Sequence, residues 1–194
     1  MSIAGVILAA GSGRRFGSDK RQAPGPQGLP LLHSVLAAFR PELEALLVVI
    51  PDGDAFGQRA CAEYDAEVLV NIDAEEGMAS SLRLAAAWVQ AHADCTGALI
   101  GLADMPLIRR DTVAAVRDCL QAEDRPVLTV FGGVPGFPRA LPRRFWPALL
   151  HLQGDTGARA LVDWSAAASV DVEDDSVIVD IDTVHDLAQL LDRS

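Results

Sequence analysis

The sequence has few of the residues that build disulfide-bonded or zinc-binding proteins. It contains three cysteines, Cys61, Cys95 and Cys119, which are widely separated and form no Cys-x-x-Cys pair. An odd and dispersed set of this kind predicts neither a disulfide framework nor a cysteine-based zinc site. The four histidines also lack the His-x-x-x-His spacing of helical zinc sites. We therefore expect the cysteines to be small core residues.

The chain also lacks a long apolar run and an excess of positive charge. The apolar stretch near its N-terminus is too short to cross a membrane and has no basic segment before it, so it is not a convincing signal peptide. The 16 Lys and Arg residues are outnumbered by 27 Asp and Glu residues, which gives a net charge of −11. Nucleic-acid-binding domains usually carry a basic face, so this balance argues against a nucleic-acid partner. We expect a cytoplasmic protein without membrane contacts.

Strand and helix patterns alternate along the first half of the chain. The 194 residues, half of them hydrophobic, fit a single domain spanning residues 1–194. The apolar run that starts at Ile3 and the runs at residues 46–50 and 67–71 predict buried strands, and residues 29–39 and 54–64 predict helices that alternate with these strands. This alternation predicts an α/β fold in which a doubly wound, mostly parallel sheet is covered by helices on both faces, in three layers.

The later part of the chain is less regular. Residues 110–121 and 142–150 predict helices, and residues 126–131 predict a strand. The Gly- and Pro-rich residues 132–138 are typical of a ligand-facing loop or a hairpin. Residues 177–181 predict a strand, followed by a final helix that ends near Leu191.

The most informative stretch is the glycine-rich, basic segment after the first predicted strand. Gly11, Gly13 and Gly17 allow close approach of the main chain to a ligand, and successive N–H groups in such a turn form an anion site. Four cationic side chains in the same segment add positive charge for phosphate oxygens: Arg14, Arg15, Lys20 and Arg21. This pattern predicts a site that holds a triphosphate, although a flexible basic connection between a strand and a helix would look the same.

Two known phosphate-binding patterns do not fit this segment. A Walker A loop needs lysine directly after its last glycine, but Ser18 follows Gly17. The dinucleotide pattern Gly-x-Gly-x-x-Gly needs a shorter spacing than that of Gly11, Gly13 and Gly17. A different nucleotide-binding arrangement is therefore indicated.

Carboxylates follow two further apolar stretches. Asp104 ends the run Ala98–Ala103, and the carboxyl ends of parallel strands are where open α/β sheets bind ligands. A carboxylate there suits Mg²⁺, which binds one or two carboxylates together with phosphate oxygens. Asp182 follows the second apolar stretch, residues 177–181. For Asp104, Ser80, Ser81 and Asp155 the alternative role is helix capping, and we expect Asp180 at an edge and Asp186 at a helix cap.

Together these segments resemble the MobA-like nucleotidyltransferases, which act on the molybdenum cofactor. The resemblance extends from Val6 to Leu190 in family order and is strongest to the molybdenum cofactor cytidylyltransferases. It implies the nucleotide-diphospho-sugar transferase variant of the doubly wound fold. It also implies nucleotide contacts at Leu8, Ala9, Ala10, Gly11, Gly13, Arg15, Gly17, Lys20, Gly77, Ser80 and Ser81. In this reading Arg15, Lys20 and Asp104 are catalytic, and Asp104 and Asp182 hold Mg²⁺.

The same resemblance implies a second, acceptor-binding group of residues. Its members lie in the segments Gly-x-Pro and Gly-Asp-x-Gly-Ala-Arg, and they are Gly136, Pro138, Gly154, Asp155 and Arg159. Arg159 would suit the terminal phosphate of molybdopterin because its guanidinium can bind two oxygens at once. Phe137 stands where the family commonly has histidine, which leaves the identity of the acceptor open.

The resemblance implies transfer of CMP from CTP to the terminal phosphate of molybdopterin, with release of pyrophosphate. Related guanylyltransferases carry glycine in place of Ala10, which favours CTP here. A molybdenum hydroxylase is a possible client of the product. The alternatives are a guanylyltransferase, a transferase acting on another phosphorylated acceptor, a MobA-like oxidoreductase, and a non-catalytic carrier of the cofactor.

Overall fold

The fold is described from a computed structural model, which describes residues 2–11, 13, 16–25, 28–154, 157–158 and 161–192. The strands are β1 (Ser2–Leu8), β2 (Ala45–Pro51), β3 (Glu67–Asn71), β4 (Cys95–Leu102), β5 (Val127–Phe131), β6 (Val134–Pro142) and β7 (Ala168–Asp171). The α-helices are α1 (Leu31–Phe39), α2 (Ala55–Glu63), α3 (Met78–Ala91), α4 (Arg110–Glu123), α5 (Trp146–Leu149) and α6 (Val184–Leu191). The 3₁₀ helices include η1 (Lys20–Gln22), η3 (Ala74–Glu76) and η7 (Asp175–Val177).

The seven strands form one sheet in the order β3-β2-β1-β4-β6-β5-β7. Strands β3, β2, β1 and β4 are parallel neighbours, whereas β6 is antiparallel to both β4 and β5, and β7 is parallel to β5. Only β6 therefore runs against the others, which makes the sheet mostly parallel, as expected. The carboxyl ends of β1 and β4 are adjacent, because Leu8 pairs with Leu102.

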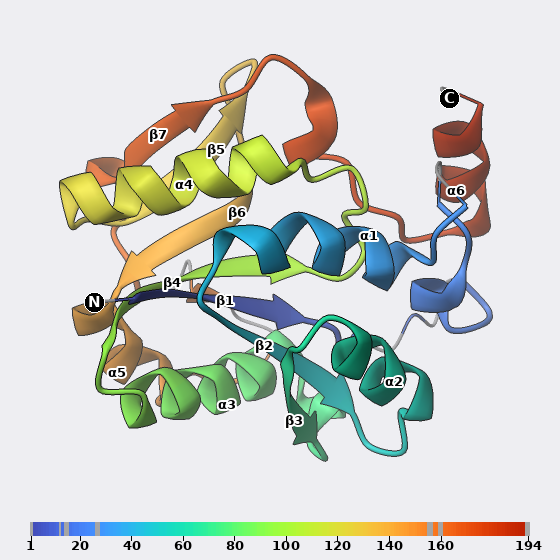
Figure 1. Cartoon of the computed structure of the whole chain (residues 1–194), viewed down its shortest axis with the longest axis horizontal. Helices are drawn as coiled ribbons and strands as arrows, with labels where there is room; N and C mark the ends of the chain where they lie inside the picture. Colours follow the sequence, from blue (N-terminus) through green and yellow to red (C-terminus); the bar gives the residue numbers. More distant parts are fainter. Residues whose placement is uncertain are drawn as a thin grey trace.

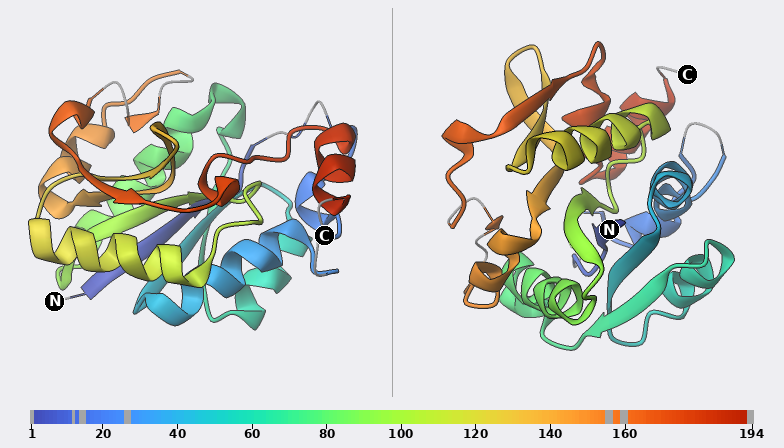
Figure 2. Two further views of the ribbon diagram at one scale, coloured as in Figure 1. Left: turned by 90° about the horizontal axis from the view of Figure 1, so that it is seen from above. Right: turned by 60° about the vertical axis from the view of Figure 1, so that its left-hand side comes forward.

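Helices cover both faces of this sheet (Figures 1 and 2). Side chains of β1 alternate between the faces: Ile3 and Ile7 pack in a core with α1, α2 and α4. Val6 and Leu8 pack in a second core with α3 and α5. The first strand is therefore buried on both sides, as its apolar sequence predicts. Within the described residues, no helix is both long and apolar enough to cross a membrane.

The C-terminal helix α6 packs away from these two cores, beside the segment that follows β1 (Figure 1). Leu187 and Leu190 of α6 form a small buried cluster with Phe16, Leu31 and Ile181. This contact brings the last part of the chain against the glycine-rich segment near its beginning.

One prediction about the second half of the chain is wrong, and one strand was not predicted. The residues 177–181 form no strand. The 3₁₀ helix η7 ends at Val177, and the chain then continues to α6 without pairing with any strand of the sheet. Val177 and Ile181 are nevertheless fully buried, so their apolar character reflects packing rather than strand pairing. The seventh strand is β7, whose sequence Ala-Ser-Val-Asp has little strand signal. The segment 132–138 contains the turn and the first residues of β6 in the hairpin that β5 and β6 form, which is one of the two forms expected.

Candidate active site

A pocket of about 470 Å³ opens at the carboxyl ends of β1 and β4. Its wall combines the end of β1 with the 3₁₀ helix η1, the start of α3 and the end of β4. The described lining residues include Leu8, Ala9, Ala10, Gly11, Lys20, Arg21, Glu75, Gly77, Met78, Ser81 and Asp104. Segments separated by up to about half of the chain thus meet where a parallel sheet ordinarily binds its ligand.

Lys20 and Asp104 lie in direct contact in this pocket. The ammonium Nζ of Lys20 donates to Oδ2 of Asp104 at 2.7 Å and to Oδ1 of Asp182 at 3.0 Å. Burial by itself would lower the pKa of Lys20, but the charges and hydrogen bonds of the two carboxylates outweigh it and raise the pKa. The lysine is therefore cationic at neutral pH, and it lies between two anions.

Asp180 joins these carboxylates, although the sequence predicts an edge position for it. One carboxylate oxygen from each of Asp104, Asp180 and Asp182 lies within 4.8 Å of the others. The pKa of Asp180 is raised by partial burial and then by the negative charges of Asp104 and Asp182. The edge assignment missed this role because it rested on local sequence, whereas the cluster forms between distant segments.

Two main-chain contacts hold the acidic segment in place. The N–H of Ile181 donates to the main-chain carbonyl of Asp104 at 2.9 Å, which ties the crossing chain to the end of β4. Asp186 caps α6 together with Thr183 and also accepts a hydrogen bond from the N–H of Asp182 at 3.1 Å. The helix-cap prediction for Asp186 is confirmed, and the cap also orients the residue that contacts Lys20.

The carboxylate cluster fits a divalent cation of the Mg²⁺ or Mn²⁺ type. Its donors are hard oxygen atoms, which such cations prefer. Oδ1 of Asp104 is buried and has no hydrogen-bond partner among the described residues, so one acceptor oxygen is available for coordination. Asp104 does not cap α4, because that helix begins at Arg110 and is preceded by Arg109.

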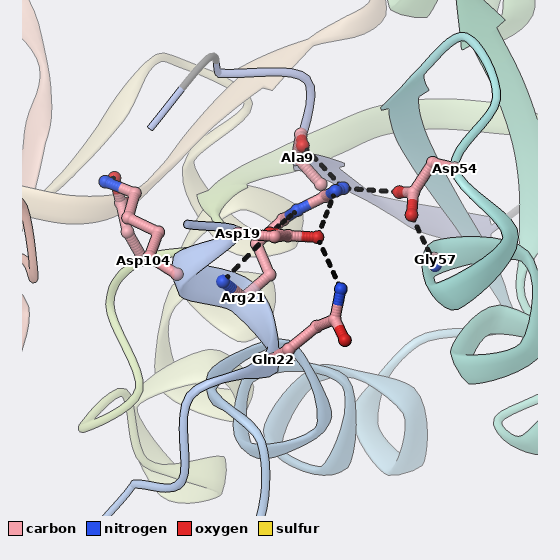
Figure 3. A network of polar contacts seen from close by, with 8 residues as sticks. Ala9, Asp19, Arg21, Gln22, Asp54, Gly57 and Asp104 are labelled. Carbon is pink, nitrogen blue, oxygen red and sulfur yellow. Dashed lines mark hydrogen bonds and ion pairs between the residues drawn. The ribbon is translucent and has the colours of Figure 1, made fainter. Parts of the chain in front are cut away.

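Arg21 lines the same pocket, but its guanidinium is bound by other groups of the protein (Figure 3). Its guanidinium donates to both carboxylate oxygens of Asp19, to the carbonyl of Ala9 and to the buried carboxylate of Asp54. Asp54 in turn accepts from the N–H of Gly57 at the start of α2. These contacts give Arg21 an anchoring role that holds η1 against β1 and α2, and the expectation that it also supplies charge to phosphates stays a prediction.

The two serines of the predicted nucleotide turn have different surroundings. Both lie in the first turn of α3, inside the helix, so neither is its N-cap. Ser81 lines the pocket, whereas the hydroxyl of Ser80 donates to the carbonyl of Gly77 at 2.8 Å. Asn71, at the end of β3, donates to both serine hydroxyls at 2.8 and 2.9 Å and is almost fully buried. Sequence reasoning missed Asn71; its only signal was a polar residue at the end of a strand.

Among the other predicted nucleotide contacts, Gly13 and Gly17 have positive φ angles of 52° and 79°. Those conformations favour glycine. Neither residue lines the described pocket. Arg15, predicted to bind phosphates, lies outside the described residues.

The predicted acceptor residues lie on β6 and on the segment after α5. Gly136 packs so closely on η7 that a Cβ atom there would lie 2.0 Å from the carbonyl oxygen of Val177, so this packing alone requires glycine. The carbonyl of Gly154 accepts from the N–H of Ala79 at 3.3 Å, which places Gly154 beside the start of α3. Pro138 is a buried residue of β6, and Asp155 and Arg159 lie outside the described residues.

Phe137, which replaces the common histidine, lies beside Arg139 of the same strand, β6. The guanidinium of Arg139 lies 4.5 Å from the ring centre of Phe137 and 5.5 Å from that of Trp164. Such cation–π contacts stabilise the placement of the arginine beside the two rings. An aromatic surface therefore occupies the position for which the family pattern has a hydrogen-bonding side chain.

The fold and site together define a nucleotidyltransferase. The seven-stranded, mostly parallel sheet with helices on both faces is the nucleotide-diphospho-sugar transferase fold expected from the sequence. A family model described as MobA-like NTP transferase domain matches residues 5–171. The chain therefore belongs to the MobA-like NTP transferase family.

Individual relatives are consistent with this assignment. The molybdenum cofactor cytidylyltransferase of Escherichia coli (strain K12) is 25% identical over 188 residues, which cover 97% of this chain and 95% of that protein. A probable molybdenum cofactor guanylyltransferase of Mycobacterium avium (strain 104) is 26% identical, over 98% of this chain and 95% of that protein. The cytidylyltransferase and the probable guanylyltransferase are thus about equally similar to this chain in sequence.

The fold also matches a crystal structure along its whole length. The structure of Rv0371c from Mycobacterium tuberculosis H37Rv superposes with a TM-score of 0.85 at 28% identity, covering 99% of this chain and 98% of that one. A complex of the same protein with manganese gives a TM-score of 0.83 at 26% identity and covers both chains fully. A manganese-binding relative and the carboxylate cluster of this chain both suggest use of a divalent metal.

Proposed function

We propose that this nucleotidyltransferase transfers CMP from CTP to the terminal phosphate of molybdopterin and releases pyrophosphate. The observation that carries the proposal is the Lys20–Asp104 contact in a pocket at the carboxyl ends of β1 and β4. A cation for phosphates and a carboxylate for a metal then face the same ligand. Of the molybdenum cofactor relatives, the cytidylyltransferase supports CTP, as does Ala10 at the position where guanylyltransferases have glycine.

In this reaction a terminal phosphate oxygen of the acceptor attacks the α-phosphorus of CTP. The new P–O bond forms as the bond to the bridging oxygen of pyrophosphate breaks, so the attacking anion needs no nucleophile from the protein. The barrier lies in bringing anions together, and it is lowered by positioning and by charge neutralisation. Lys20 and Arg15 would offset the charge of the departing pyrophosphate, and the main-chain N–H groups of the glycine-rich segment would orient the phosphates.

Asp104 and Asp182 would hold Mg²⁺, and Asp180 lies close enough to be a third ligand. The bound cation would polarise the α-phosphate and compensate its negative charge. Ser81 and Gly77 would contact the nucleoside from the start of α3, and Asn71 would fix the orientation of the serine hydroxyl. Gly154, Asp155 and Arg159, with Gly136 and Pro138, would form the acceptor side, where the rings of Phe137 and Trp164 offer an apolar surface.

Pyrophosphate release tests this proposal when it is measured with CTP, GTP, ATP and UTP, each with and without molybdopterin. We expect release with CTP that depends on molybdopterin and on Mg²⁺. Asp104→Asn should lower the rate by about 100-fold or more, because a metal ligand contributes several kcal/mol to the transition state. Asp118→Asn removes an exposed carboxylate from α4 and should leave the rate unchanged.

The other outcomes identify the alternatives. Release with GTP would indicate a guanylyltransferase, and release with another phosphorylated acceptor would change the acceptor. Consumption of NAD(P)H would indicate an oxidoreductase, and nucleotide binding without turnover would indicate a carrier. A molybdenum hydroxylase remains the proposed client, and the cytoplasm the proposed location.

A further inference from the structure

Lys20 is the only lysine in the chain. The remaining 15 of the 16 basic residues, apart from histidine, are arginines. This lysine is also buried, with 11% of its side chain exposed, whereas surface lysines usually extend into water. A single lysine in an arginine-rich chain therefore lies at the pocket that we assign to the nucleotide.

The contacts of Lys20 are the carboxylates that the proposed function assigns to the metal. Its ammonium contacts Asp104 at 2.7 Å and Asp182 at 3.0 Å, and Asp180 lies in the same cluster. Since Asp180 also raises the local negative charge, the ammonium is the counter-ion that allows these carboxylates to lie together. A divalent cation on the same carboxylates would be repelled by the ammonium at such short range.

We propose that Lys20 and the divalent cation compete for Asp104 and Asp182. When the nucleotide binds, its phosphates bind the Lys20 ammonium, and the two carboxylates become available to the metal. The inference rests on the proposed function and adds an order to it: the metal binds tightly only together with the nucleotide. Lys20 then has two roles: it is the counter-ion of the carboxylates in the free enzyme, and it binds the phosphates in the nucleotide complex. The free enzyme would thereby bind little metal, and the triphosphate would complete its own metal site.

The chemistry of lysine suits this exchange better than that of arginine. An ammonium is a compact charge on a flexible stem with three rotatable donors, so it can turn from carboxylates to phosphates. A guanidinium forms two parallel hydrogen bonds with one carboxylate and is held in that geometry. Arg21, the next residue, shows this behaviour, because it binds Asp19 through two nitrogens.

Manganese affinity of the full-length protein tests the competition. The concentration of free Mn²⁺ can be measured by electron paramagnetic resonance in solutions of the wild type, of Lys20→Met and of Arg125→Met. The last variant removes one exposed charge just before β5, at the opposite end of the strands. Without nucleotide, we expect the Mn²⁺ affinity of Lys20→Met to be at least about tenfold higher than that of the wild type. We expect the Mn²⁺ affinity of Arg125→Met to equal that of the wild type. Equal or weaker binding by a folded Lys20→Met would overturn the inference.

The single lysine also allows a test on the unmodified protein. Protein labelled with ¹³C-lysine gives one side-chain Cε signal, which belongs to Lys20. We expect millimolar Mg²⁺ alone to leave this signal in place, and Mg²⁺ with a non-hydrolysable CTP analogue to move it. A signal that moves equally with Mg²⁺ alone, or that does not move with the saturating magnesium nucleotide, would contradict the exchange.

The two proposals can fail separately. If CTP turnover occurs but Lys20→Met binds Mn²⁺ no more tightly, the transferase proposal stands and the exchange does not. If Lys20→Met binds Mn²⁺ more tightly but no nucleotide is turned over, the competition stands and the assigned reaction is wrong.

Discussion

Replacing Arg21 with methionine removes the charge that holds the segment after β1 on the sheet. Its guanidinium and the carboxylate of Asp54 are both almost fully buried, with 9% and 4% of their side chains exposed. Without the arginine, Asp54 becomes a buried carboxylate whose remaining hydrogen bond within the described part of the chain comes from the N–H of Gly57. Breaking a buried pair from one side costs about 3–5 kcal/mol.

This cost can be measured by urea denaturation. With a slope of about 3 kcal/mol per molar urea, the midpoint should fall by about 1–2 M. A double-mutant cycle isolates the pair, because adding Asp54→Asn to Arg21→Met removes the unpaired charge and should restore part of the loss. Arg109→Met is the matched control: it breaks exposed pairs with Asp111 and Asp174 and should change the free energy of unfolding by less than about 1 kcal/mol.

If Arg21 instead served mainly as a phosphate ligand, its removal would leave stability almost intact and weaken nucleotide binding alone. A loss of less than about 1 kcal/mol, or a double variant no more stable than Arg21→Met, would refute the anchoring role.

Four further changes test other parts of the structure. Arg143 donates to four main-chain carbonyls at the end of α3 and the start of β4, so Arg143→Met should destabilise the protein by about 2 kcal/mol in thermal or urea unfolding. The neighbouring exposed Arg144→Met should cost less than about 1 kcal/mol, and equal losses would contradict this assignment. Asn71→Ala leaves two buried serine hydroxyls without their donor, so it should cost about 1–3 kcal/mol and raise the KM for nucleotide; an unchanged KM would argue against its role in the site. Asp180→Asn should raise the melting temperature in a chelator-containing buffer and weaken Mn²⁺ binding, because it relieves repulsion among the carboxylates but removes a ligand charge. Burial alone would raise the pKa of Asp19, but hydrogen bonds from Arg21 and Gln22 hold it below its usual value. Its contribution to stability is therefore complete above about pH 4 and is lost as the pH falls through the lowered pKa, so Asp19→Asn should flatten this part of a stability–pH curve.

The first half of the fold follows from the sequence because its strands are buried on both faces. The residues of β1 and β2 form nearly continuous apolar runs that leave little choice of structure. The edge strand β7 is short and partly exposed, so its sequence carries little signal. The stretch 177–181, of which Val177 and Ile181 are buried, resembles a strand without forming one. Apolar patterns report burial, and the hydrogen-bond partner of a segment depends on the rest of the fold.

The site divides in a similar way. Lys20 and Asp104 could be assigned to one pocket because both follow adjacent parallel strands, where the carboxyl ends meet. The roles of Arg21 and Asp180 could not, because their partners come from distant parts of the sequence. The role of Arg21 depends on its ion pair with Asp54 at the start of α2. The role of Asp180 depends on the hydrogen bond from Ile181 to the main chain of Asp104.

The most direct measurement of the central claim is the position of Mn²⁺ in crystals of the protein with a non-hydrolysable CTP analogue. The account predicts an anomalous-scattering peak coordinated by Asp104 and Asp182 and by nucleotide phosphate oxygens, with the ammonium of Lys20 on the phosphates. A nucleotide bound away from the carboxyl ends of β1 and β4, or a manganese ion that contacts neither carboxylate, would contradict it.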